Sequence, residues 1–521
     1  MMQDKMMQMM QKNNLGSSGL SSGGNELKVK VALVAALLAL TFVYLMRSPL
    51  FFLHSGVPGG DSCIFKTVAL YMDRGFMPYK DTFDHKGPLI YIYNWIGLHI
   101  SYLRGVWFVQ FVSLFCALVA TYKTARLFCD RLSAFLAVAV FAAHLMSYHV
   151  LEENFTEEYA LPFIALSFYI FIDYFLFERV SRKRLCASGF CFAAVLLLRP
   201  NMVTLWAVFC IAVLVNELKQ KSFAQLATFL LFFLIGAAII MVPILVWLCV
   251  NGAFFAMIRD SIVFNMKYSS ATTAAVAGRL VAMLHFARHP LVLLSLVCAL
   301  WLLIKRRDIF HIAYFTCLVA SLIFLSMSGR IFEHYALVLI PLVTYTTAKI
   351  LVRLHGFKKA KYVVAILCYL LIVRSMIPLR QICNSVLGTH FDDSHREKGL
   401  SEIAAAKEIS QIIAERTSED DRITVFGNFD VIYVLSKRLS ASRYSYQTRM
   451  DISQQIQDEY FEDLEQTPPA AIVLPENIKQ IGGGITEGKI GYEQMTSFIE
   501  THGYVLLKEV DGNKVYVPQR D

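Results

Sequence analysis

The chain has 521 residues, of which 56% are hydrophobic and only 17% charged, and its mean hydropathy is +0.51. These values are too apolar for a soluble protein of this size and predict a polytopic helical membrane protein. The formal net charge of +9 does not indicate nucleic-acid binding, because the Lys and Arg residues stand in short groups between apolar segments. Membrane lipids, and no nucleic acid, are therefore the expected surroundings of the chain.

Residues 1–27 are rich in Met and Gln and then in Ser and Gly, which is typical of a flexible tail. The apolar run that follows lacks a small-residue cleavage site, so it predicts an uncleaved anchor and not a signal peptide. We expect a disordered cytoplasmic tail over 1–27 and a transmembrane domain over 28–379.

The apolar segments predict the membrane spans, since a helical span needs about 17–25 apolar residues. The expected spans are 30–46, 105–122, 133–151, 159–178, 185–199, 202–216, 224–249, 290–304, 309–327, 335–352 and 361–378. A further run, 88–103, is short, and we expect it to dip into the membrane and return or to lie at its surface. A weak segment near 272–287 would raise the number of spans from about 11 to 13.

Clusters of Lys and Arg mark the cytoplasmic side of a membrane protein. If the Lys and Arg clusters that lie between the spans are cytoplasmic, the other loops lie outside the membrane. These are 47–104, 152–158 and 250–289, together with everything after residue 379. The N terminus is then cytoplasmic, and the C-terminal part is extracytoplasmic.

Residues 380–521 predict a separate soluble α/β domain. An amphipathic helix is expected over 400–416, with strands over 422–427 and 470–475. Near the C terminus Asp511–Gly512 lies between alternating apolar residues, which is the strongest short signal for a β-hairpin.

The first external loop, 47–88, carries much polar chemistry beside the membrane. Asp61 precedes an amphipathic helix expected over 62–74, whose apolar face would lie on the membrane surface. Asp61 would be the N-cap of this helix, and capping alone would account for it. Capping does not explain the second charged cluster, Asp84–His85–Lys86, at the entry of the next apolar segment.

Charged residues also stand at the outer ends of other spans. Glu153 lies in EENFTEE, Arg199 in LLLRPN, and Arg330 and His334, followed by Tyr335, in SGRIFEHYALVLIP. Such charges are costly and usually face a cavity or one another. Each one alone is explained as a snorkelling or paired residue, but several outer loops together indicate a polar cavity that opens outward at the membrane surface.

Common nucleotide and zinc motifs are missing from the sequence, which contains no Walker A loop, no strand-linked G-x-G-x-x-G and no H-E-x-x-H. The expected cavity also faces away from cytoplasmic nucleotides. A catalyst at this surface would need a donor that is available there, which indicates a lipid-linked substrate.

A resemblance to the GT-C glycosyltransferases is carried by the segment GGDSCIFKTVALYMDRGFMPYKDTFDHKGPLIYIYNWIG, which is similar to their first external loop. The nearest relatives would be bacterial enzymes similar to protein O-mannosyltransferases and lipid A aminoarabinose transferase. EENFTEEYALPFIALSFY, LLLRPN, SGRIFEHYALVLIP and SASRYSYQ extend the resemblance over nearly the whole chain after residue 28. It implies an α-helical polytopic membrane protein of GT-C-like fold with a C-terminal extracytoplasmic α/β domain.

The resemblance also implies roles for particular residues. Asp61 matches the family's catalytic position, and Ser62 stands where many relatives have a second acid. Asp84, His85 and Lys86 match a region that contacts the lipid phosphate and a metal in aminoarabinose transferase-like enzymes. The other substrate-binding residues implied in this way are Glu153, Arg199, Arg330, His334, Tyr335, Arg443 and Tyr444.

The implied reaction is an inverting transfer of a hexosyl or pentosyl group from a polyprenyl-phosphate donor, of the undecaprenyl-phosphate type, to an extracytoplasmic lipid, cell-surface glycan or protein. Because the leaving phosphate is a stable anion, the site needs cations near it, and Asp61 would take the proton of the acceptor hydroxyl. A divalent metal ion is compatible with Asp84, His85 and His334 as ligands, although no spacing requires one. No other cofactor is expected.

The alternative function is a transporter or flippase of lipid-linked sugars. It predicts charges deep within the spans, broken helices and inverted repeats. In this sequence the charges gather near one face and no repeat is visible, which favours the enzyme. A bacterial inner membrane is the expected location, because the N-terminal tail is rich in Met and few cysteines lie outside the apolar segments.

Overall fold

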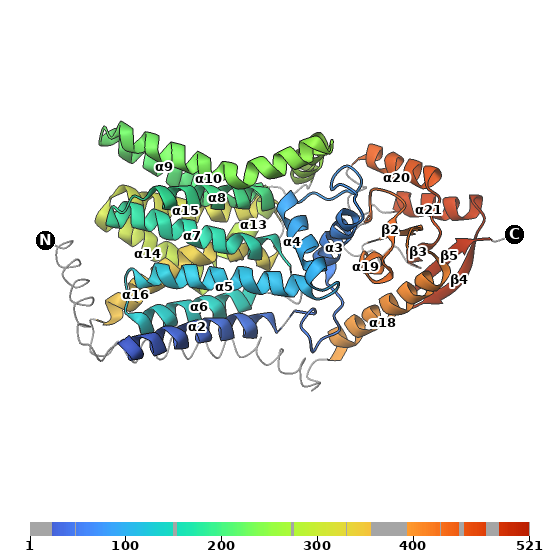
Figure 1. Ribbon diagram of the computed structural model, residues 1–521, viewed down its shortest axis with the longest axis horizontal. Coiled ribbons are helices and arrows are strands. Elements are labelled where there is room, and N and C mark those ends of the chain that lie inside the picture. The colour runs from blue at the N-terminus through green and yellow to red at the C-terminus, as the bar shows by residue number, and fades with distance from the viewer. Residues whose placement is uncertain are drawn as a thin grey trace.

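The computed structural model describes residues 23–46, 48–148, 154–271, 276–329, 331–355, 393–427, 429–446, 453–475 and 489–519. It consists of a long helical bundle with a smaller domain of helices and one sheet at one end (Figure 1). The two short helices of the first external loop and the run after it lie between these two parts (Figure 1). The expected disordered tail falls mostly outside the described residues, and α2 begins inside it, at Gly23.

The helices of the bundle follow the apolar segments of the sequence. They are α2 (Gly23–Leu45), α5 (Gly105–Arg126), α6 (Arg131–Tyr148), α7 (Thr156–Phe177), α8 (Arg182–Leu198), α9 (Thr204–Lys219), α10 (Phe223–Val250), α14 (Pro290–Arg306), α15 (Ile309–Ser326) and α16 (Ile340–His355). Of the described helices, six are long and apolar enough to cross a membrane, or seven if the pair 277–287 and 290–306, which is bent by 89°, forms one span. The chain is therefore an integral membrane protein of the helical class. The expected span 361–378 lies outside the described residues.

Shorter helical segments connect the long helices. They are η1 (Pro200–Met202), α11 (Phe254–Ile258), the π-helical turn η2 (Arg259–Val263), α12 (Phe264–Ala271), α13 (Val276–Ala287) and η3 (Glu333–Leu339). The weak segment expected near 272–287 is thus represented by α13, which packs against α15.

The first external loop forms α3 (Gly60–Asp73), and the run after it forms α4 (Pro88–Ile100). With 13 residues, α4 is about 20 Å long, which is less than the roughly 30 Å of a bilayer hydrocarbon core. A full crossing by this helix is therefore not possible, as the sequence-based interpretation expected of 88–103.

The helix predicted over 62–74 is present as α3, but it differs from the prediction in two ways. First, its N-cap is Gly59, which has no side chain to bond, so Asp61 lies within the first turn and does not cap the helix. Second, α3 does not rest on the membrane surface. Phe65 and Val68, on the apolar face expected to meet lipid, are buried in the core cluster of the helical bundle. On another side of α3, Cys63 belongs to a core cluster with Ile409 of the C-terminal domain.

The C-terminal domain contains a five-stranded mixed sheet in the order β2-β1-β3-β5-β4. Its elements are α18 (Asp393–Arg416), β1 (Arg422–Val425), α19 (Val431–Ser436), β2 (Leu439–Ser440), α20 (Gln454–Gln466), β3 (Ile472–Pro475), α21 (Lys489–Thr501), β4 (Tyr504–Val510) and β5 (Asn513–Pro518). β1 runs parallel to β2 and β3, whereas β5 is antiparallel to β3 and β4. The predicted helix, both predicted strands and the hairpin are all present.

The hairpin turn has the backbone that its sequence predicts. Asp511 and Gly512 have φ angles of 48° and 70°. A two-residue type I′ turn needs positive φ at both positions, and Asp–Gly is one of the few pairs that accept it at low cost. The sequence analysis missed β2, which has only two residues and depends on pairing with β1.

Candidate functional site

Side chains of the first external loop bind the C-terminal domain by donating hydrogen bonds to backbone carbonyls of that domain. The Arg74 guanidinium donates to the carbonyl oxygens of Glu419 and Lys437 at 2.6 and 2.7 Å. The Tyr71 hydroxyl donates to the carbonyl of Ser440 at 3.0 Å. The loop therefore has the C-terminal domain on one side and the helical bundle on the other, and a site at this junction is built from all three.

Asp84 is the centre of one polar cluster at this junction. It is 2% exposed, and its Oδ1 accepts hydrogen bonds from the His85 backbone N at 2.7 Å and from the Tyr446 hydroxyl at 2.9 Å. Its Oδ2 accepts from the Tyr91 hydroxyl at 2.8 Å. Burial by itself would raise the pKa of Asp84, but hydrogen bonds to His85 and the charges of His85 and Lys86 outweigh it and hold the pKa below its usual range. Asp84 is therefore a charged acceptor that ties the loop to the C-terminal domain.

His85 and Lys86 continue this cluster toward the bundle. His85 Nδ1 lies 3.2 Å from Asp84 Oδ1, and the amide of Asn265 donates to the His85 carbonyl at 2.7 Å. Lys86 Nζ lies 3.1 Å from His85 Nε2. Within the described ranges Lys86 has no ion pair with a carboxylate, so its charge is available to an anion.

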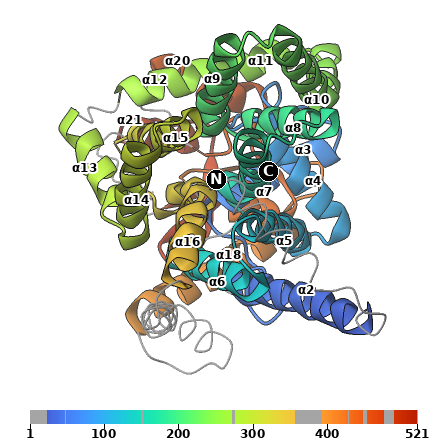
Figure 2. The same cartoon turned by 90° about the vertical axis from the view of Figure 1, so that its left-hand side faces the viewer.

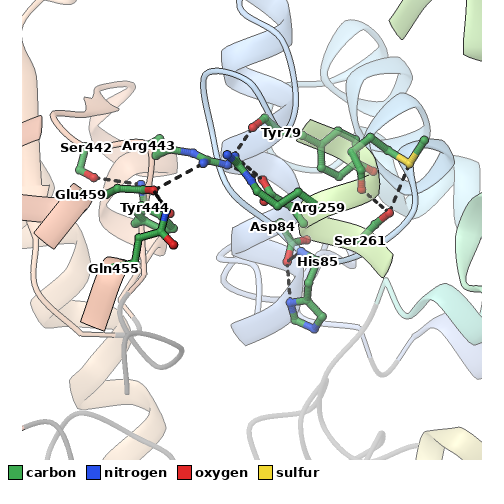
Figure 3. A network of polar contacts seen from close by, with 12 residues as sticks. Tyr79, Asp84, His85, Arg259, Ser261, Ser442, Arg443, Tyr444, Gln455 and Glu459 are labelled. Carbon is green, nitrogen blue, oxygen red and sulfur yellow. Dashed lines mark hydrogen bonds and ion pairs between the residues drawn. The ribbon is translucent and has the colours of Figure 1, made fainter. Parts of the chain in front are cut away.

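Arg443 joins three segments at the other side of Asp84 (Figure 3). Its guanidinium donates to the Tyr79 carbonyl at 2.8 Å and pairs with Asp260 of the π-helical turn η2. Asp260 also accepts from Arg259 Nε at 2.8 Å. The Arg443 carbonyl in turn accepts from the backbone N of Phe83 at 2.7 Å. Arg443 thus acts as a clamp between the loop, η2 and the C-terminal domain.

Tyr444 lies beside this clamp, and its hydroxyl is bound within the C-terminal domain. Its hydroxyl donates to Glu459 at 2.6 Å, and the Arg443 guanidinium lies 5.0 Å from its ring (Figure 3). The resemblance placed Arg443 and Tyr444 at the substrate. In the structure Arg443 binds Tyr79 and Asp260 through its terminal nitrogens, and the Tyr444 hydroxyl binds Glu459. The buried Nε of Arg443 has no hydrogen-bond partner among the described residues.

A second cluster lies at the ends of α7 and α8. Arg199, at the C-terminal end of α8, forms an ion pair with Glu157 in the first turn of α7. The Arg199 guanidinium also lies 4.4 Å from the centre of the Tyr335 ring. The half-buried carboxylate of Asp61 acts electrostatically on both Arg199 and His334. Four residues predicted from the sequence, Asp61, Arg199, His334 and Tyr335, are therefore brought together.

His334 connects the two clusters. Its ring stacks on that of Phe155 with 3.9 Å between the ring centres and 7° between the planes. The charges of Lys86 and Asp61 both act on it. The charges of Lys86, Arg199 and Asp61 therefore all act on His334, which gathers three basic side chains and one carboxylate near one another.

Gly87 allows the end of the first external loop to lie against the end of α8. Its backbone N donates to the Leu198 carbonyl at 3.0 Å, and a Cβ at this position would lie 2.1 Å from the carbonyl oxygen of Leu197. Only glycine permits such close contact between two backbones. The contact holds the end of the loop, with Lys86, beside the end of α8, with Arg199.

The sequence analysis missed a buried polar layer behind this region. Asn154, whose φ is 69°, donates to the Ser62 hydroxyl at 3.1 Å and to Asn94 at 2.8 Å. Ser62, where relatives often have an acid, therefore joins α3 to the start of α7. Glu158 is fully buried and accepts from the Tyr44 hydroxyl at 2.9 Å. The run of polar residues at one span end was the available signal, but it did not reveal these partners.

Glu153 and Arg330 lie outside the described residues. No group of three His, Cys, Asp or Glu side chains in the described ranges is arranged to hold a metal ion, so Asp84, His85 and His334 do not form such a set. The reason is that the Asp84 oxygens face tyrosine hydroxyls, while His334 stacks on Phe155.

Comparisons with known proteins agree with the helical membrane architecture. ArnT from Cupriavidus metallidurans bound to undecaprenyl phosphate superposes with a TM-score of 0.58 at 13% identity, covering 96% of this chain and 100% of that one. The same protein in the apo state gives a TM-score of 0.61 at 12% identity and covers 95% and 100%. The apo oligosaccharyltransferase of Archaeoglobus fulgidus gives 0.51 at 12% identity and covers 85% and 69%. At these identities the likeness shows the fold, which is the GT-C fold that the sequence resemblance implied.

A search of curated proteins found no match. A family model described as "Putative competence-induced protein Ccs4 N-terminal domain" matches residues 27–361, which cover the helical bundle and the first external loop. The chain therefore combines a GT-C fold with a junction where the charges of Asp61, Lys86 and Arg199 act on His334, and it belongs to the family of the putative competence-induced protein Ccs4 N-terminal domain.

Proposed function

We propose that this protein is an inverting glycosyltransferase that moves a sugar from a polyprenyl-phosphate donor, of the undecaprenyl-phosphate type, to an extracytoplasmic lipid, glycan or protein. The observation that carries the proposal is the gathering of charge around His334, on which Asp61, Lys86 and Arg199 all act where the bundle adjoins the first external loop. A protein of the same fold, ArnT, has been seen with undecaprenyl phosphate bound, which supports a lipid phosphate as the donor.

The basic side chains suit the phosphate of the donor. Lys86 has no carboxylate partner in the described ranges, so it can pair with the phosphate as negative charge develops on the leaving oxygen. Arg199 is held in one orientation by Glu157 and by the Tyr335 ring, and its charge adds to the positive potential. The charges of Lys86 and Arg199 both act on His334, which adds a third basic side chain to the cationic side of the site.

Asp61 suits the acceptor side of the reaction. Its carboxylate is half-buried and lies in the first turn of α3, where the free backbone N–H groups and the helix dipole stabilise negative charge. The acceptor hydroxyl oxygen attacks the anomeric carbon from the face opposite the phosphate, and its proton passes to Asp61. The bond between the anomeric carbon and the phosphate oxygen breaks, the electron pair leaves with the phosphate, and the configuration inverts.

The orientation in the membrane follows from the same proposal. The C-terminal domain and the site lie outside, the N terminus is cytoplasmic, and a bacterial inner membrane is the location. The distribution of Lys and Arg between the spans supports this orientation. A cysteine introduced at the exposed Glu462 should react with a membrane-impermeant thiol reagent added outside intact cells, and labelling only after the membrane is opened would refute the orientation.

The catalytic role is tested with Asp61→Asn, which keeps the size of the side chain and removes its basicity. Transfer of sugar to envelope lipids, glycans or proteins, detected by mass spectrometry, should fall about 10²–10⁴-fold, the usual contribution of a general base. Asp73→Asn at the exposed end of the same helix is the matched control and should leave the yield unchanged. Equal yields from Asp61→Asn and the wild type would reject Asp61 as the base.

Donor binding is tested separately with undecaprenyl phosphate itself. Native mass spectrometry of the purified protein should show binding that Lys86→Ala weakens and Asp61→Asn retains. Failure of the wild type to bind undecaprenyl phosphate would reject this class of donor, whatever the result for Asp61.

A further inference from the structure

A cavity of about 480 Å³ lies between α5, α7 and α8 at the end of the bundle that points away from the C-terminal domain. It is formed by the last turn of α5, the middle of α7 and the first turn of α8. Figure 2 looks at this end of the bundle and shows these three helices next to one another, as their packing requires. A cavity of this volume is large enough for a small ligand or a lipid headgroup.

This cavity is separate from the candidate active site. Along α7, Glu157 at the site and Ile170 at the cavity are 13 residues apart, which corresponds to about 20 Å of helix. Along α8, Arg184 and Arg199 are 15 residues apart, or about 22 Å. No residue that lines the cavity belongs to either cluster described above.

The cavity is strongly basic. Lys123, Arg126, Lys183 and Arg184 line it, and no acidic residue does. Arg184 is oriented by an ion pair with Asp173, and Arg126 by a hydrogen bond to the Cys129 carbonyl.

The two lysines differ from the arginines in their surroundings. Lys123 and Lys183 are exposed, and within the described part of the chain neither has an ion pair or a hydrogen bond from its side chain. α8 also begins at Arg182, so its free N–H groups add positive potential at the same place. The cavity therefore presents two fixed guanidinium groups and two lysines that can close on an anion.

The remaining wall of the cavity is apolar. Leu166 and Ile170 contribute to it from α7, and they lie 11 and 7 residues before the end of that helix at Phe177. The cavity thus reaches about 10–17 Å along the bundle from that helix end, to the depth of lipid acyl chains. A free anion needs only the basic rim, whereas a phospholipid uses both the rim and the apolar wall.

We propose that this cavity binds the phosphate headgroup of an anionic phospholipid from the leaflet opposite the C-terminal domain. Basic cavities between membrane helices are suited to such headgroups because the phosphate meets cations while the acyl chains stay beside apolar side chains. The bound lipid would join α5, α7 and α8 at this end, and α7 and α8 also carry Glu157 and Arg199 at their other ends.

The test uses the full-length protein in nanodiscs and two lipids that differ in headgroup charge. Phosphatidylglycerol retained by the protein in native mass spectrometry should exceed phosphatidylcholine. The double variant Lys123→Ala/Lys183→Ala should bind phosphatidylglycerol about 10- to 30-fold more weakly, since each basic residue near a membrane surface contributes about a three- to fivefold change. Lys219→Ala/Lys305→Ala removes two exposed lysines that do not line the cavity and should bind as the wild type does.

Each other outcome overturns the proposal. Equal retention of the two lipids would mean that headgroup charge is not recognised, and equal losses in both double variants would mean that the cavity is not the place of binding. Inorganic phosphate that displaces phosphatidylglycerol at millimolar concentration would show a site for a free anion and not for a lipid. The unfolding midpoint of each variant in phosphatidylcholine controls for misfolding.

Discussion

The hydrogen bond from Tyr446 to Asp84 allows a direct measurement of how firmly the C-terminal domain holds the first external loop. The phenol donates to a buried, charged carboxylate across 362 residues of sequence. Tyr446→Phe removes the donor with little change in shape and leaves the Asp84 charge with fewer partners. A hydrogen bond to a charged group contributes about 1.5–3 kcal/mol, so the free energy for separating the domain from the loop should fall by about this amount.

Hydrogen exchange in detergent micelles measures this free energy. The backbone N of Phe83 donates to Arg443, so it becomes exposed when the domain separates from the loop. Its protection should decrease about 10- to 150-fold in Tyr446→Phe, because each 1.4 kcal/mol is a factor of ten. Tyr504→Phe is the control, since that hydroxyl donates to the Pro469 carbonyl within the C-terminal domain. A change of less than threefold at Phe83, or the same change in the control, would refute the reasoning.

Two further predictions concern Gly87 and Asp430. Gly87→Ala places a Cβ against the Leu197 carbonyl and should lower the free energy of unfolding by about 1–3 kcal/mol, measured by thermal unfolding. Gly491→Ala is the control and should be tolerated, because the nearest atom to its Cβ is a side-chain atom of Phe426 at 3.4 Å. Equal unfolding midpoints for the two variants would contradict the close-contact argument. Burial, together with the charge of Asp84, raises the pKa of Asp430 to about 7 despite the hydrogen bond from Ser445. Its value in an unfolded chain is about 4, so its contribution to stability is complete below pH ~4 and is lost as the pH rises toward 7. The pH dependence of unfolding over this interval should therefore weaken in Asp430→Asn, and an unchanged dependence would show that another group titrates.

Local rules predicted much of the fold because the responsible residues are close in sequence. The lengths of the apolar segments anticipated α5, α7, α10 and α15. The Asp511–Gly512 pair predicted its hairpin because the turn depends on two backbone angles. The start of α3 was predicted less well, since Asp61 is a good capping residue by type but lies two positions beyond the N-cap, Gly59.

The candidate site depends on contacts that no local pattern contains. The resemblance implied roles for Asp61, Lys86 and Arg199, but the partner of Arg199 is Glu157, 42 residues away, which the sequence analysis did not single out. The resemblance implied that Asp84 contacts the donor or a metal, but it did not reveal that its carboxylate accepts hydrogen bonds from Tyr91 and Tyr446. Such pairings are selected by packing, because a buried charge is stable only where donors are already in place.

The amino-acid sequence by itself determined the class of this protein: apolar segments of membrane-spanning length, charged residues gathered at one side, and a polar loop that resembles those of GT-C glycosyltransferases. Only the tertiary structure decided that α3 lies beneath the C-terminal domain and not on the lipid, and that Gly87 brings Lys86 to the end of α8. The physical reason is that hydropathy and spacing act over one or two helical turns. The position of a charge in a site depends on backbones that meet after hundreds of residues.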